Sequence, residues 1–167
     1  MFEEGKNAIE KPQGHHCFAC GTANPKGLNL QFYREGDAVC TEIILDRTYE
    51  GWENVAHGGI VSTLVDEVMS WATMCDRKDL YVTRKMNVKY VRPVKIGTPL
   101  KVKGMVTGHS APPKVQAKAE IRDHEGRLLV RGAGEFVKVT GGTLDSVPAN
   151  MKEEMPVSYT HLTLPTN

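Results

Sequence analysis

The chain has 167 residues, a formal net charge of +1, 40% hydrophobic residues and 25% charged residues. This length fits one domain with a buried core, and the composition is ordinary for a globular protein. A charge so close to zero excludes a chain-wide attraction to nucleic acid or to an anionic membrane, so we expect neither as a partner. The polar segment 1–11 lacks the apolar centre of a secretion signal. We therefore expect a cytoplasmic protein whose four cysteines, Cys17, Cys20, Cys40 and Cys75, are reduced thiols.

Two strand patterns precede the first helical pattern. Residues 1–27 are rich in Gly, Pro, Asn and Lys and predict an irregular lead-in. Apolar and polar residues alternate over 28–33, which predicts a strand, and a second strand pattern covers 38–45. The turn residues Glu35, Gly36 and Asp37 separate the two strands, and a loop is expected over 46–56.

A broad apolar stripe at helical spacing then runs from Ile60 to Cys75. At about 100° per residue these side chains cover most of a helix, so we predict one long and largely buried helix. Its opposite edge is polar. The polar positions are Ser62, Thr63, Asp66, Ser70 and Thr73.

Four strand patterns follow the helix, over 82–90, 99–109, 114–123 and 127–139, with a tight turn at 123–126. Two strands, one apolar helix and four further strands predict an α+β fold in which an antiparallel sheet wraps around one long central helix. We expect this single domain to span residues 28–140. After about residue 140 the periodicity is lost, so we predict that 141–167 form a disordered tail. Its last ten residues look like translated cloning sequence and carry no functional argument.

The entrance to the predicted helix carries the residues best suited to chemistry. Gly58 and Gly59 leave the first helical N–H groups without side-chain cover, so a ligand carbonyl can approach them closely. These amides and the positive end of the helix dipole favour an oxyanion. Asp66 lies seven residues after Gly59, nearly two turns on, and so on the same side of the helix. An Asp on a polar helix edge is usually just solvated, but the burial of this helix favours a partly desolvated carboxylate that can act as a base.

The sequence His57-Gly58-Gly59 followed by Asp66-Glu67 closely resembles the hotdog-fold acyl-CoA thioesterases of the PaaI-like group. The segments CFACG at 17–21 and NPKGL at 24–28 are similar to the lead-in of one branch of that group. Residues 82–97 resemble its strand after the helix, and Gly126 with residues 132–136 resemble its last hairpin. The resemblance covers roughly residues 15–140.

This resemblance implies hydrolysis of an acyl-CoA thioester to a free acid and CoA, without a cofactor. It implies a homodimer, and possible tetramers, whose two sheets join and whose active sites lie at the interface. The Gly58 amide would polarise the thioester carbonyl, and Asp66 would act as general base on water or as a nucleophile through a mixed anhydride. Thr83 matches a hydroxyl of the partner subunit that helps to place the water. Ser70, one turn after Asp66, would orient Asp66 or the substrate.

One position departs from the family pattern. Many relatives carry an Asn six residues before the His, where it contributes to the oxyanion site, and this chain has Gly51 there. Glu50 is therefore expected to take a polar positioning role beside it. His57 is expected to shape the loop by hydrogen bonding rather than to act as acid or base. The predicted substrate contacts are His57, Gly59, Glu50, Asn54, Glu67 and Arg92.

Other residues admit two interpretations. His15, His16, Cys17 and Cys20 have the chemistry of zinc ligands, but no second ligand pair follows later in the chain. We therefore predict a packed loop and no metal. The basic residues could bind the CoA phosphates or could simply form a solvated face. They are Lys85, Lys89, Arg92, Lys95, Lys101 and Lys103.

Two other functions compete with thioester hydrolysis. A hydratase or dehydratase of a related fold relies on a His that works with an acid, which the His-Gly-Gly entrance followed by Asp66 argues against. A non-catalytic acyl-CoA-binding module is the second alternative, and release of free thiol would exclude it. The identity of the acyl chain does not follow from the sequence.

Overall fold

The structure is a computed structural model that describes residues 7–107 and 111–140. The predicted tail and the end of the strand predicted to reach His109 lie outside these residues. One helix, one 3-10 turn and nine strands follow one another along the described chain. In order they are β1 (Asn7–Ile9), β2 (Phe32–Glu35), β3 (Ala38–Ile44), η1 (Arg47–Tyr49), β4 (Glu50–Trp52), β5 (Val55–Ala56), α1 (Gly58–Arg77), β6 (Tyr81–Tyr90), β7 (Pro99–Thr107), β8 (Lys114–Asp123) and β9 (Leu128–Lys138).

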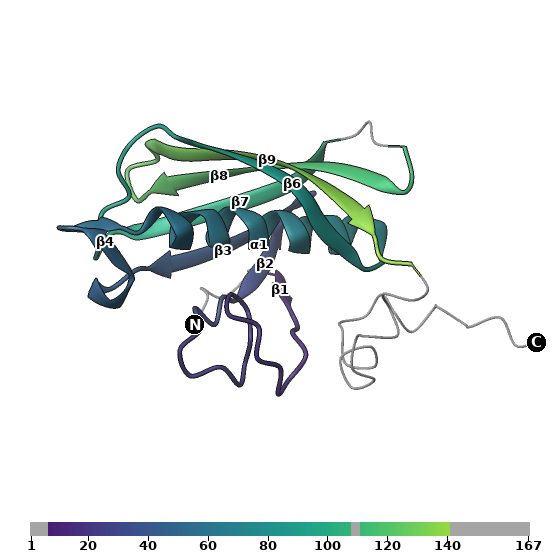
Figure 1. The fold of residues 1–167 in the computed structure, drawn as a ribbon, viewed down its shortest axis with the longest axis horizontal. Helices are drawn as coiled ribbons and strands as arrows, with labels where there is room; N and C mark the ends of the chain where they lie inside the picture. The colour runs from purple at the N-terminus through teal and green to yellow at the C-terminus, as the bar shows by residue number, and fades with distance from the viewer. Residues whose placement is uncertain (1–6, 108–110, 141–167) are drawn as a thin grey trace, which may run out of the picture.

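Seven of these strands form one antiparallel sheet in the order β1-β2-β3-β7-β8-β9-β6. The sheet curves over α1, which runs along its inner face (Figure 1). The predicted α+β fold with one central helix is therefore confirmed. Strands β4 and β5 form a small separate hairpin just before the helix begins.

The helix lies close to the sheet because two glycines of the sheet face it. A Cβ atom added at Gly104 would lie 2.6 Å from the backbone oxygen of Val68, and one added at Gly132 would lie 2.1 Å from Cγ1 of Val65. Any larger residue at either position would push α1 away from the sheet. The apolar stripe predicted from periodicity is this contact face, since both valines are fully buried.

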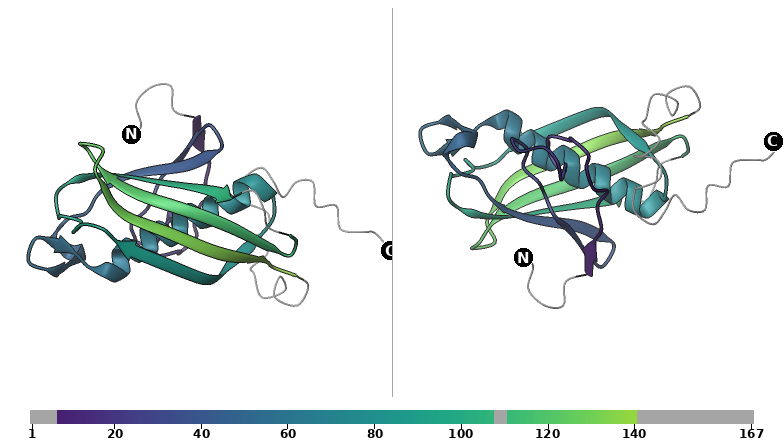
Figure 2. Two further views of the ribbon diagram at one scale, coloured as in Figure 1. Left: turned by 90° about the horizontal axis from the view of Figure 1, so that it is seen from above. Right: turned by 90° about the horizontal axis from the view of Figure 1, so that it is seen from below.

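The lead-in covers the opposite side of the helix, where it crosses α1 in the view from below (Figure 2, right). Ala19, Cys20, Leu28 and Leu30 are buried there as part of the main core. The helix is thus enclosed between the sheet and residues 11–30. This explains why apolar residues occupy so much of its circumference.

Two expectations for the N-terminal part were wrong in detail. The lead-in, predicted to be irregular throughout, contains β1, which pairs with β2 at the sheet edge. The strand predicted over 28–33 begins only at Phe32. The amides of Leu28 and Leu30 donate instead to the carbonyls of Phe18 and Ala19, at 2.8 and 3.0 Å. Apolar and polar side chains do alternate over 28–33, but at Leu28 and Leu30 the alternation reflects packing against the lead-in and not a strand.

The remaining boundaries lie close to those predicted. The helix is longer than its apolar stripe and runs from Gly58 to Arg77, because His57 caps its start and Lys78 ends it in the left-handed conformation, at φ 54°. Strand β8 has the predicted bounds, and β9 is one residue shorter at each end. The loop predicted over 46–56 contains η1 and the β4–β5 hairpin. Within the described residues, no helix has the length and apolar character needed to cross a membrane.

Candidate active site

His57 caps the first turn of α1. Nδ1 of His57 accepts a hydrogen bond from the Gly59 amide at 2.9 Å, so that amide is already occupied. The Gly58 amide is the first of the helix and has no acceptor inside it by position. Gly58 is exposed. Of the two glycine amides proposed from the sequence, Gly58 is thus the one available to a ligand, and His57 has the structural role expected for it.

A tyrosine that sequence analysis did not identify completes this end of the helix. The hydroxyl of Tyr90 donates to the Gly58 carbonyl at 2.7 Å and lies 2.7 Å from Oγ of Ser62. Its side chain is 51% exposed. Tyr90 is the last residue of the strand pattern predicted over 82–90, and no local pattern shows that β6 ends beside the helix entrance. Tyr90 fixes the backbone at Gly58 and forms one wall of the adjacent surface.

Asp66 meets Thr83 on the polar edge of the helix. Oγ1 of Thr83 donates to Oδ1 of Asp66 at 2.7 Å, and Asp66 is partly buried. A register shift between Thr83 and Lys85 interrupts the pairing of β6 with β9, and such an irregularity turns side chains away from regular alternation. The resemblance implied a hydroxyl from a partner subunit at this position. In the single chain, Thr83 contacts the Asp66 of its own chain.

The helix separates Gly58 from Asp66. Eight residues of α-helix correspond to roughly 12 Å along the axis. A general base must lie within about 3 Å of the proton that it takes, and an oxyanion donor within about 3 Å of the oxygen. The Gly58 amide and the Asp66 carboxylate of one chain are therefore poorly placed to act on the same carbonyl group.

The departure at Gly51 has a steric cause. A Cβ atom at this position would lie 2.7 Å from Cα of His57 and 3.0 Å from its Cβ. The capping histidine thus occupies the space that an Asn side chain would need. Glu50, expected to replace that Asn, accepts a hydrogen bond from the Asn54 amide and so closes the β4–β5 turn. Asn54 itself has a positive φ of 59° in that turn.

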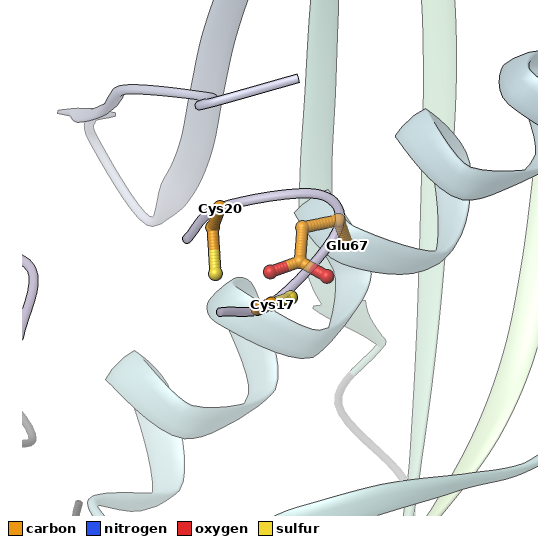
Figure 3. Close-up of side chains that lie close together, drawn as sticks. All are labelled: Cys17, Cys20 and Glu67. Atoms are coloured by element: carbon orange, nitrogen blue, oxygen red, sulfur yellow. The ribbon is translucent and has the colours of Figure 1, made fainter. Parts of the chain in front are cut away.

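Glu67 faces away from Asp66, toward the lead-in. The indole N–H of Trp71 donates to Oε1 of Glu67 at 3.0 Å, and the carboxylate lies beside Cys17 and Cys20 (Figure 3). Burial, and next the neighbouring Cys17, raise the pKa of Glu67 to about 7. The structure thus separates this residue from the other predicted substrate contacts.

The other predicted contacts are distributed along the helix and β6. Ser70 is partly buried one turn after Asp66. Arg92 follows β6 and donates to the Leu128 carbonyl at 2.7 Å. Two of the six basic residues, Lys101 and Lys103, bind Glu35 at 2.5 and 2.6 Å, so they are engaged within the sheet.

A shallow, mostly apolar pocket of about 340 Å³ opens beside the helix entrance. It brings Gly58 and Arg92 together with Tyr90, and thus joins the available amide, a cation and an apolar surface. The residues that line it are Val55, Ala56, Gly58, Val61, Tyr90, Val91, Arg92, Pro93 and Val94. Asp66 and Thr83 are not among them.

Comparisons with known proteins agree with this fold. A model of the thioesterase superfamily matches residues 53–110. A solved thioesterase superfamily protein is 24% identical with a TM-score of 0.68, covering 73% of this chain and 63% of that one, so this chain spans less than two thirds of its length. The E. coli PaaI protein from the phenylacetic acid degradation operon is 16% identical, with a TM-score of 0.62 over 68% of this chain and 82% of its own.

The zebrafish thioesterase superfamily member 2 is similar to the same degree, at 21% identity and a TM-score of 0.60 over 66% of this chain and 81% of its own. A comparison with curated proteins gave no significant match. The fold is the hotdog fold, which this chain shares with solved thioesterase superfamily proteins, and the superfamily model matches the segment that contains the helix entrance, α1 and β6.

Proposed function

We propose that the protein hydrolyses acyl-CoA thioesters, with Asp66 as the general base. The observation that carries this proposal is the 2.7 Å hydrogen bond from Thr83 to Asp66, which holds one carboxylate oxygen and leaves the other to accept a proton from water. The water oxygen then attacks the thioester carbonyl carbon. The resulting oxyanion is bound by the Gly58 amide, and its collapse expels the CoA thiolate.

Coenzyme A as the leaving group is supported by a protein of the same fold. A thioesterase protein of Streptococcus pneumoniae, 20% identical with a TM-score of 0.61, was solved with coenzyme A. The same protein was also solved with one threonine and with one aspartate replaced by alanine, the residue types that meet here in Thr83 and Asp66. In this chain the pocket beside Gly58 and Arg92 would receive the thioester end of the substrate.

A two-chain site follows from the separation along the helix. Since Gly58 and Asp66 of one chain lie roughly 12 Å apart along the axis, we propose that each site takes Gly58 from one subunit and Asp66 with Thr83 from the other. Strand β6 is a suitable interface because in the described chain it pairs with β9 alone and ends the sheet. Its ten residues present Val82 and Tyr90 at 53% and 51% exposure. A long strand edge without a second neighbour in the described chain can pair with the same edge of a second copy.

The first experiment measures thiol release from a panel of aliphatic and aromatic acyl-CoAs. Asp66→Asn is expected to lower kcat by roughly 100-fold or more, because the base is lost while the shape is kept. Thr83→Val is expected to lower it by roughly 10-fold to 100-fold, since a hydrogen bond to a charged group is lost, and the matched Thr83→Ser should retain most activity. Acyl-CoA binding without thiol release by the wild type would support the binding module instead.

The second experiment tests the two-chain site by mixing two variants that are each expected to be inactive, because Asp66→Asn lacks the base and the methyl group of Gly58→Ala covers the amide that the thioester oxygen must approach. A Gly58→Ala chain and an Asp66→Asn chain, refolded or co-expressed together, would form mixed dimers with one intact site. Activity should return to about a quarter of wild type, because half of the dimers are mixed and half of their sites are intact. An added Cβ at Gly58 would lie 3.4 Å from the Tyr90 hydroxyl, an ordinary contact, so this variant should fold. No recovery on mixing would place both residues in a single-chain site.

A further inference from the structure

Two cysteines of the lead-in and one glutamate of the helix lie together on the side of α1 away from the sheet. The Sγ atoms of Cys17 and Cys20 and a carboxylate oxygen of Glu67 all lie within 4.8 Å of one another. In Figure 3 the three side chains face a common point between the lead-in and the helix. These residues take no part in the proposed hydrolysis.

The turn that carries the cysteines is shaped to present both sulfurs on one side. The amides of Cys20 and Ala19 donate hydrogen bonds to the Cys17 side chain. The Gly21 amide donates to the Cys17 carbonyl at 2.9 Å. A Cβ atom at Gly21 would lie 2.3 Å from that carbonyl oxygen, so the turn requires a glycine at this position. Amide donors around a sulfur favour the thiolate, which is the form that binds metals.

The glutamate is oriented as a metal ligand would be. The Trp71 indole occupies Oε1 of Glu67, which leaves Oε2 directed to other partners. Hydrogen bonds of this kind fix metal-binding carboxylates in many sites. Sequence analysis had considered His15 and His16 as further ligands beside the cysteines. The third group that the fold brings to the pair is Glu67 instead, 47 residues after Cys20.

A divalent cation bound to two thiolates and a carboxylate here would have its charge balanced by the groups around it. Two thiolates and a carboxylate this close together repel one another strongly in a buried site. The Lys11 ammonium is buried beside them, donating to the carbonyls of Cys20 and Leu30 at 2.9 and 2.7 Å. With Lys11, one divalent cation balances the three negative charges to zero. Lys11 alone would leave two of these negative charges unbalanced.

We propose that Cys17, Cys20 and Glu67 bind one zinc ion that fastens the lead-in to the central helix. Around a tetrahedral zinc ion, two sulfurs and a carboxylate oxygen lie roughly 3.5–3.8 Å apart, a small contraction from the observed cluster. Two sulfur ligands favour zinc over magnesium or calcium, which prefer oxygen ligands only. A water molecule completes the tetrahedron. Binding releases the remaining thiol protons to solvent.

The test is the metal content of the full chain purified without chelator, by inductively coupled plasma mass spectrometry. We expect about one zinc per chain, strongly reduced in Cys17→Ser, Cys20→Ser and Glu67→Gln. The matched controls are Cys40→Ser and Cys75→Ser, since both cysteines lie in regular elements away from the cluster. These two variants should keep the zinc.

Cobalt substitution supplies a readout that does not depend on purification history. Chelator-treated protein titrated with Co²⁺ should develop the thiolate-to-cobalt charge-transfer band, and Cys20→Ser should abolish it. Circular dichroism checks that each variant is folded. Wild-type protein that neither contains zinc nor gives the cobalt band would overturn the proposal. So would a Cys17–Cys20 disulfide, seen as two rather than four reactive thiols in denatured protein. Thioesterase activity is not part of either readout.

Discussion

The close contact between α1 and β9 can be tested by a paired substitution. In Gly132→Ala the new methyl group would lie 2.1 Å from Cγ1 of Val65, which is fully buried. Relief requires a shift of the helix or an unfavourable rotamer, and such overpacking costs about 1–3 kcal/mol. Val65→Ala alone leaves a cavity and costs about 2–3 kcal/mol, from roughly 0.8 kcal/mol per buried carbon plus the cavity.

The two substitutions together should cost less than the sum of their separate effects. In the double variant the methyl group of residue 132 enters the space left by Val65, so we expect a favourable coupling of about 1–2 kcal/mol. The measurement is urea unfolding followed by tryptophan fluorescence, at one fixed protein concentration because the protein is proposed to be a dimer. Each kcal/mol should also move Tm by about 2–4 °C.

A second glycine supplies the control. At Gly104 the added methyl group would meet the backbone oxygen and carbon of Val68, at 2.6 and 2.8 Å. Shortening the Val68 side chain leaves that backbone in place, so Val68→Ala should rescue Gly104→Ala far less. Additive costs at Val65 and Gly132, or equal rescue at both glycines, would refute the packing that we describe.

Three further outcomes are expected. Lys11→Met should destabilise the protein by about 1–3 kcal/mol in urea unfolding, because the buried carbonyls of Cys20 and Leu30 lose their donor. Glu35→Gln should change stability by less than about 1 kcal/mol in the same assay, because its pairs with two lysines are exposed to solvent. Asp123→Asn should flatten the acid side of the stability profile. Burial raises the pKa of Asp123 but hydrogen bonds from Arg127 outweigh it and lower the pKa below 3.8, so its contribution is present above about pH 4 and is lost as the pH falls further. A variant as acid-sensitive as wild type in thermal scans from pH 6 to pH 2 would contradict this.

The helix and the strands after it could be predicted because their signal is local. The apolar stripe from Ile60 to Cys75 repeats at helical spacing, and β8 alternates so regularly that its bounds were predicted correctly. The strand before β3 shows the limit of that signal. Leu28 and Leu30 alternate with polar residues as a strand would, yet their hydrogen-bond partners lie in the lead-in. Alternation reports burial on one side and does not identify the partner.

The candidate site was predictable in its chemistry and only partly in its arrangement. Gly58 and Asp66 were predicted as a pair, but the helix was predicted only from Ile60, and their separation of roughly 12 Å along its axis follows once the helix is seen to begin at Gly58. Tyr90 was missed because its role depends on where β6 ends in space. Glu67 was predicted as a substrate contact at the border of the apolar stripe, whereas one step along a helix turns its side chain about 100° away from Asp66. That rotation directs it to the cysteines of the lead-in.

The contact between Gly51 and His57 has a consequence for how this site can change over generations. The two positions share one space, because a side chain at 51 would overlap the backbone and Cβ of His57. An asparagine acquired at 51 would be unfavourable until the β4–β5 hairpin moved, because the shortest contact is with the backbone of His57 and would persist without the imidazole. An asparagine at 51 beside a histidine at 57 is therefore expected only where the β4–β5 hairpin lies farther from the helix start than it does here. A helix entrance with an asparagine at position 51 would therefore require a rearranged β4–β5 loop in addition to the substitution itself.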